Sequence, residues 1–166
     1  MDIVIREALP AEYAELGEVT ARAYVLDGLL EGHDDDPYAA VLRDVAGRAA
    51  QGTVLVAVDR EGRLLGGLAY APPGSPLADI ARAGEAEFRM LAVAREGRGR
   101  GAGEALVRAC LERARATPGV TRMVMSTQPA MRGAQRIYER LGFTRSPERD
   151  WSPRPGLSLL TYGLDL

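Results

Sequence analysis

The 166-residue sequence predicts a single α/β domain over residues 1–166, of the α+β type. Its centre is expected to be one mixed, mostly antiparallel sheet of about six or seven strands flanked by about four helices. Three observations lead to this prediction. Short apolar runs alternate with amphipathic segments of helical period, two of the runs are joined by the turn DREGR, and no repeat or linker interrupts the chain. The hydrophobic fraction of 46% is enough for one buried core.

The expected elements alternate along the chain, and each has a local reason. Pro10 and Pro37 suit the first turn of a helix, where the missing N–H of proline is not needed. Apolar residues recur every three or four positions in the helical segments, whereas apolar and β-branched residues run together in the strands. Helices are expected at 10–26, 37–50, 101–117 and 130–140. Strands are expected at 3–5, 53–58, 64–70, 85–93, 120–126, and at Phe143 with 157–166.

Composition excludes several classes of protein. All 21 basic residues are arginine, so no lysine can form a Schiff base or hold a phosphate, which excludes pyridoxal-phosphate enzymes and ordinary phosphate-loop NTPases. A net charge of −2 gives no general attraction to nucleic acid. No apolar run reaches the length of about 18 residues that spans a membrane. A soluble cytoplasmic protein is therefore expected, with its single cysteine, Cys110, in the core.

A loop rich in glycine and arginine, REGRGRGAG at 95–103, joins an apolar strand to an amphipathic helix. Glycines let backbone N–H groups approach one anion, and the helix start adds the positive end of its dipole. Both features favour a phosphate or pyrophosphate, as do the charges of Arg95, Arg98 and Arg100. The stretch 97–102 also fits a dinucleotide-binding loop, but the acidic residue expected about 20 positions later is absent from 116–122.

Three motifs in one order resemble those of the GCN5-related N-acetyltransferase (GNAT) family. RGRGAG at 98–103 matches R-x-x-G-x-G, AEFRMLAV at 86–93 precedes it, and AQRIYERLGF at 134–143 follows it. The resemblance implies a GNAT-like fold in which two neighbouring strands splay apart at the cofactor, acetyl-CoA. It also implies direct transfer of an acetyl (acyl) group to the primary amine of a small-molecule or peptide acceptor. The alternative is a non-catalytic domain of the same fold that binds acyl-CoA as a sensor or partner module.

The resemblance also implies which residues hold the cofactor. In the family, the loop and the helix start bind the pyrophosphate through backbone amides, which assigns Arg98, Gly99, Arg100, Gly101, Ala102 and Gly103. The preceding strand bends at a bulge and offers backbone groups to the pantetheine arm, which assigns Leu91, Ala92 and Val93. A backbone N–H at this place would stabilise the developing oxyanion.

Two side chains are candidates for proton transfer. Tyr138 matches the tyrosine that acts in the family as general acid on the leaving thiolate. Glu87 lies where some members place a general base that acts through water, and Glu85 is its substitute. No metal ion and no covalent enzyme intermediate are expected. Met131 departs from the family pattern, because many relatives carry an asparagine at this position.

The acceptor site of the family is walled by the first two helices, the loop between them and the C-terminal hairpin. Here that loop is acidic, which favours a cationic amine; its carboxylates are Glu31, Asp34, Asp35 and Asp36. Trp151 either lines the acceptor pocket or forms an apolar plug under a loop. His33 is expected to be exposed and without a catalytic role. The resemblance allows a homodimer, although nothing in the sequence fixes the oligomeric state.

Overall fold

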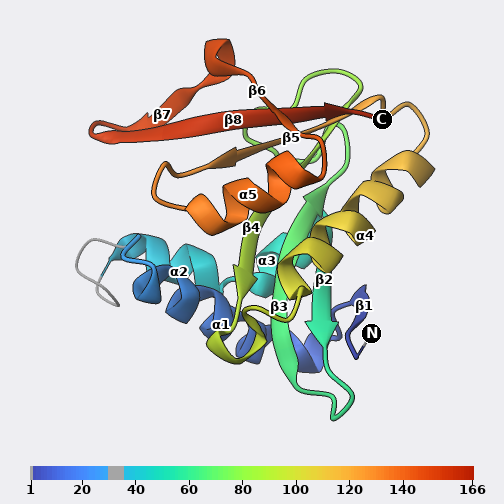
Figure 1. Ribbon diagram of the computed structural model, residues 1–166, viewed down its shortest axis with the longest axis vertical. Coiled ribbons are helices and arrows are strands. Elements are labelled where there is room, and N and C mark those ends of the chain that lie inside the picture. The colour runs from blue at the N-terminus through green and yellow to red at the C-terminus, as the bar shows by residue number, and fades with distance from the viewer. Residues whose placement is uncertain (1, 30–35) are drawn as a thin grey trace.

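The computed structural model describes residues 2–29 and 36–166, and in these residues one eight-stranded sheet is flanked by five α-helices (Figure 1). The strands are β1 (Val4–Glu7), β2 (Thr53–Val58), β3 (Leu64–Ala71), β4 (Glu85–Val93), β5 (Arg122–Thr127), β6 (Thr144–Arg145), β7 (Trp151–Arg154) and β8 (Leu157–Asp165). The helices are α1 (Tyr13–Leu26), α2 (Pro37–Arg43), α3 (Val45–Gln51), α4 (Ala102–Ala116) and α5 (Arg132–Arg140). The predicted mixed α/β architecture is thus confirmed.

The sheet has the order β1-β2-β3-β4-β5-β8-β6, with β7 paired to β8, and its neighbours are antiparallel except for β4 and β5. These two parallel strands pair only from Glu85 to Glu87, opposite 122–124, and then diverge. Beyond the divergence β4 is bent at Met90, which has φ 57, and the pairing of β4 with β3 shifts register there. The splayed strand pair predicted from the family resemblance is therefore present, and the bulge lies on β4.

Helices cover both faces of the sheet because its strands alternate their side chains between two apolar layers. On β2, Leu55 and Ala57 pack in the cluster that contains the apolar face of α4, whereas Val54 and Val56 pack with residues of α1 and α3. Figure 1 shows α4 crossing the sheet over β2 and β3, with α1 and α3 behind it. Each layer thus has its own core, and the central strands are buried on both sides.

The structure differs from the prediction in two elements. The single helix expected at 37–50 is two helices, because Asp44 leaves the helical region (φ −83, ψ 67) and caps α3 by accepting a hydrogen bond from the Gly47 amide. Arg48 donates to the carbonyl oxygens of Val41 and Leu42, which satisfies the interrupted end of α2. The strand β7 was also not predicted. None of the described helices combines the length and the apolar character that crossing a membrane requires.

Candidate functional site

The glycine-rich loop prepares the start of α4 for an anion. A short 3-10 turn, Arg95–Gly97, ends β4, and Gly99 (φ 76) and Gly101 (φ 83) then take the left-handed conformation that favours glycine. Gly101 is the N-cap of α4, and a Cβ built on it would meet nothing within 4 Å. The first amides of a helix have no partner inside it, so the loop presents N–H groups and the positive end of the helix dipole to open space.

This open space is a cavity of about 480 Å³, here called the loop cavity. Every residue that the family resemblance assigns to the cofactor lines it except Arg100: Leu91, Ala92, Val93, Arg98, Gly99, Gly101, Ala102 and Gly103. Arg98 is fixed at its edge by Asp27, whose Oδ1 lies 2.8 Å from Nη1. Arg100 instead turns toward Asp59, with Nη1 and Oδ2 4.0 Å apart, so its side chain is not part of the lining.

A second cavity of about 410 Å³, the hairpin cavity, lies between α1, α2, the divergent ends of β4 and β5, and the β7–β8 hairpin. Its lining includes Trp151, so of the two alternatives for this residue the structure favours the pocket wall. Tyr24 and Met131 line both cavities, which therefore meet at these two side chains. Along β4 the bulge separates them, because Glu87, Arg89 and Met90 face the hairpin cavity whereas the residues after Met90 face the loop cavity.

Glu87 is the buried carboxylate of the hairpin cavity, with an exposed fraction of only 1%. Its Oε1 accepts hydrogen bonds from the amides of Asp79 (3.1 Å), Ile80 (2.8 Å) and Ala81 (2.9 Å). Burial raises the pKa of Glu87 above its ordinary value, and the three amides offset this rise only in part. The group is thus a carboxylate with increased basicity, held by one oxygen at the cavity wall.

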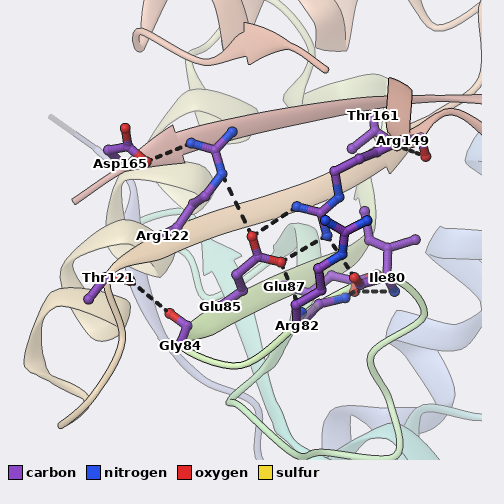
Figure 2. A network of polar contacts seen from close by, with 11 residues as sticks. Ile80, Arg82, Gly84, Glu85, Glu87, Thr121, Arg122, Arg149, Thr161 and Asp165 are labelled. Atoms are coloured by element: carbon purple, nitrogen blue, oxygen red, sulfur yellow. Dashed lines mark hydrogen bonds and ion pairs between the residues drawn. The ribbon is translucent and has the colours of Figure 1, made fainter. Parts of the chain in front are cut away.

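Glu85, the expected substitute for Glu87, lies in a different environment. It lines neither cavity, and Arg149 binds both of its oxygens at 2.8 Å (Figure 2). Burial alone would raise the pKa of Glu85, but the hydrogen bonds from Arg149 and from the Arg82 amide lower it below its ordinary range. Two buried positions on one face of β4 thus carry carboxylates whose pKa values shift in opposite directions.

Tyr138 lies in the aromatic core under α5 and lines neither cavity of the described chain. Its ring packs against Phe88, Phe143 and Tyr162 at centroid distances of 5.7 to 5.9 Å. Burial raises the pKa of Tyr138, and the phenol of Tyr24 raises it further. Tyr24 itself stands where the two cavities meet.

Polar residues at the end of β5 complete the hairpin cavity, and they belong to no sequence motif. Trp151 Nε1 donates to Ser126 Oγ at 2.9 Å. Thr127 is 3% exposed, and its Oγ1 has no hydrogen-bond partner among the described residues. A buried hydroxyl without a partner costs about 1–3 kcal/mol, so its presence at a cavity wall indicates a place for a polar ligand group. In the sequence these residues are marked only by their position at the C-terminal end of β5, where β4 and β5 have diverged.

Comparison with known proteins decides the family. The model of the acetyltransferase (GNAT) family matches residues 14–143. This chain belongs to the GNAT acetyltransferase family. No curated protein matches it. The three GNAT-like motifs lie at 86–93, 98–103 and 134–143, all within the matched range.

Solved GNAT structures share the fold over nearly the whole chain. The protein yncA of Salmonella typhimurium, solved with acetyl-CoA, has a TM-score of 0.72 at 23% identity and covers 100% of this chain and 95% of its own. A GNAT protein of Kribbella flavida has 0.71 at 22% identity, covering 99% and 98%. A phosphinothricin acetyltransferase of Sinorhizobium meliloti, solved with AcCoA, has 0.71 at 20% identity, covering 100% and 89%.

The remaining sequence-based candidates have different outcomes in this GNAT chain. Glu31, His33, Asp34 and Asp35 lie outside the described residues. Asp36 is described: it caps α2 by accepting a hydrogen bond from the Tyr38 amide at 2.9 Å. Cys110 is fully buried in the core, where burial raises the pKa of its thiol and keeps it protonated. A protonated, enclosed thiol is a poor nucleophile.

Replacing Gly101 by valine should block the loop cavity. Valine would add a β-branched side chain at φ 83, pointing into space that is now open. We expect acetyl-CoA to bind at least about tenfold more weakly, which corresponds to about 1.4 kcal/mol, measured by titration calorimetry. Gly119→Val is the matched control, because Gly119 also has φ 83 and an open Cβ position but lines neither cavity. Equal affinity of the Gly101 variant and this control would remove the loop from the site.

Proposed function

We propose that this protein is an N-acetyltransferase that moves an acetyl group from acetyl-CoA directly to the primary amine of a small-molecule or peptide acceptor. The observation that carries the proposal is the meeting of the two cavities at Tyr24 and Met131. One cavity presents backbone N–H groups and a helix start, and the other contains a buried carboxylate of raised pKa. A donor and an acceptor bound on the two sides would therefore meet without an enzyme-bound intermediate.

The loop cavity suits the pyrophosphate and the pantetheine arm of coenzyme A. Glycines at 99, 101 and 103 keep side chains away from the helix start, and Arg98 adds a positive charge at the edge. Beyond the bulge, Leu91, Ala92 and Val93 line the same cavity, on the part of β4 that no longer pairs with β5. Two of the GNAT structures that share the fold were solved with acetyl-CoA, which supports this choice of cofactor.

Two protons have to move during the transfer, and this chain offers a group for each. Bound acetyl-CoA supplies the acetyl group and a thiol leaving group. Glu87 takes a proton from the acceptor amine, directly or through water, so that the nitrogen lone pair can attack the carbonyl carbon. A backbone N–H at 91–93 stabilises the negative charge that develops on the carbonyl oxygen. Tyr138 is the candidate of the family pattern for donating a proton to the departing sulfur; because its buried phenol lines neither cavity, Tyr24, which lines both, is the alternative donor.

The acceptor fits a site of limited size and mixed polarity. A volume of about 410 Å³ suits a small molecule or the end of a peptide. Three aromatic rings lie along the wall, from Tyr24, Tyr38 and Trp151. In the described lining, Asp79 and Arg89 pair with each other at 3.1 Å and Arg154 is a further cation, so Glu87 is the carboxylate left to meet the amine. A preference for polycations would have to come from the acidic residues at 31–35.

Release of free thiol tests the proposal. The protein is mixed with acetyl-CoA and each member of a panel of primary amines, and liberated coenzyme A is followed with a thiol reagent. Amine-dependent thiol release supports transfer. Binding of acetyl-CoA without release for any amine would favour the non-catalytic acyl-CoA-binding module instead.

Tyr138→Phe should lower kcat by about a hundredfold or more, the usual contribution of a general acid. Acetyl-CoA affinity should change little, because the proton is needed only as the thiolate leaves. Steady-state kinetics and titration calorimetry separate the two quantities. Tyr24→Phe is the informative comparison, since Tyr24 lines both cavities. A large loss of kcat in the Tyr24 variant with none in the Tyr138 variant would transfer the acid role to Tyr24.

Thr127→Val should weaken acceptor binding without destabilising the fold. The variant keeps the shape and removes a buried hydroxyl that has no partner, so the free energy of unfolding should stay level or rise. The KM of the amine should rise by about threefold to tenfold, the value of one hydrogen bond. The control is Thr20→Val, which removes a buried hydroxyl that donates to the Leu16 carbonyl at 2.8 Å and should therefore cost stability alone. An unchanged KM in the Thr127 variant would contradict the acceptor role.

A further inference from the structure

The segment 79–82 is attached to β4 by two carboxylates. The amides of residues 79, 80 and 81 bind Glu87 Oε1, as described above, and the Arg82 amide donates to Glu85 Oε1 at 2.9 Å. The position of Glu87 and the geometry of this segment are therefore linked, because each amide that moves away removes a hydrogen bond that favours the charged carboxylate.

Arg149 holds the segment from the other side. It ends the short turn Pro147–Arg149 before β7, and its side chain is 9% exposed. Nη1 and Nη2 each bind an oxygen of Glu85 at 2.8 Å, and Nη2 also donates to the carbonyl oxygen of Ile80 at 2.8 Å. Figure 2 shows this guanidinium between Glu85 and the peptide of Ile80, beside Glu87. Arg149 thus holds Ile80 in place, and the amide of Ile80 makes the shortest of the three hydrogen bonds to Glu87.

We propose that Arg149 is a positioning residue of this acetyltransferase, which holds Glu87 in place through the segment 79–82. The proposal rests on the proposed function, because it assigns a purpose to the placement of the proposed base. The same contact ties the β7–β8 wall of the hairpin cavity to β4, since Trp151 follows Arg149 by two residues.

The charges around Glu87 determine the direction of the effect. Asp79, which belongs to the segment 79–82, raises the pKa of Glu87. Its ion-pair partner Arg89 lies on β4, the strand that carries Glu87. Hydrogen bonding to Glu85 raises the pKa of Arg149, and the charges of Glu148 and Glu87 add to that rise. The phenols of Tyr24 and Tyr38 border the cavity from α1 and α2, and the cation of Arg154 borders it from β7.

Loss of Arg149 would therefore remove a positive charge and, at the same time, weaken the hydrogen bonds from the amides of residues 79–81 to Glu87. Both changes disfavour the charged form of Glu87, so its pKa should rise further. Arg122, 3.8 Å from Glu85 Oε2, would remain as a partner of Glu85 and limit the damage to the fold.

The test compares Arg149→Met and Arg149→Lys with the native protein and with Arg145→Met. Arg145 is the matched control: it binds both oxygens of Asp150 at 2.9 and 2.8 Å and donates to the Thr161 carbonyl, but it does not contact the segment 79–82. The readouts are kcat, the KM of acetyl-CoA, the pH profile of turnover and a ¹³C NMR titration of the glutamate carboxyl carbons. Glu87→Gln identifies the Glu87 signal.

For Arg149→Met we expect kcat to fall about tenfold to a hundredfold at neutral pH, the usual cost of a small displacement of a reacting group. The KM of acetyl-CoA should be unchanged. The acidic limb of the pH profile and the Glu87 titration should both move to higher pH, since Glu87 must lose its proton to act as a base. Arg149→Lys, which keeps the charge but not the two-pronged geometry, should lie between the native protein and Arg149→Met. Arg145→Met should lower thermal stability and leave the pH profile unchanged.

An unchanged Glu87 titration in a folded Arg149→Met or Arg149→Lys variant would overturn the proposal, as would equal shifts in the Arg145 control. The NMR arm needs no turnover. A moved titration in a protein that acetylates no amine would therefore support the positioning role and reject the proposed function.

Discussion

The divergence of two parallel strands is the constraint on which the site depends. β4 and β5 share hydrogen bonds only as far as Glu87 and Val124, and past this point the sheet opens. The bulge at Met90 then turns β4 so that successive stretches of one strand face different cavities. Without the opening, a continuous sheet would occupy the space in which donor and acceptor are proposed to meet.

The same opening explains why the chain contains groups that a stable core would avoid. Glu87 is buried with a raised pKa, and Thr127 has a buried hydroxyl without a partner among the described residues. Both border the opening, since Glu87 is the last residue of β4 that pairs with β5 and Thr127 is the last residue of β5. Burial of such groups lowers stability, and proteins accept this mainly at functional sites. The three amides on Glu87 offset part of that cost.

Local sequence predicted most of the fold. The bounds of β2 and β4 match the expected runs 53–58 and 85–93. β2 is continuous in apolar or β-branched character, β4 alternates charged and apolar residues from Glu85 to Met90, and both strands end at turn residues. The glycine loop was predicted for the same local reason, since it directly precedes an amphipathic helix. The break between α2 and α3 at Asp44 was missed because it depends on the hydrogen bonds from the Arg48 side chain to the end of α2. The spacing of apolar residues does not reveal these bonds. The strand β7 was missed because it forms only by pairing with β8.

The candidate site was less accessible to sequence. Glu85 and Glu87 look equivalent in an alternating strand, and contacts from elsewhere in the chain distinguish them: Arg149 binds Glu85, whereas the amides of residues 79–81 bind Glu87. Tyr24 reaches the junction from α1, and no motif marks it. Residues that the family pattern contains could be named in advance, whereas those set by long-range packing could not.

Thermal unfolding with acetyl-CoA, CoA, NADH or NADPH tests most directly whether the loop cavity is an acyl-CoA site. At about a hundredfold excess over the dissociation constant, a ligand adds roughly 2.7 kcal/mol, which is about 5 to 10 °C for a domain of this size. We expect this shift with acetyl-CoA and CoA and none with the nicotinamide nucleotides. A shift with NADH or NADPH alone, or none with either CoA species, would contradict it.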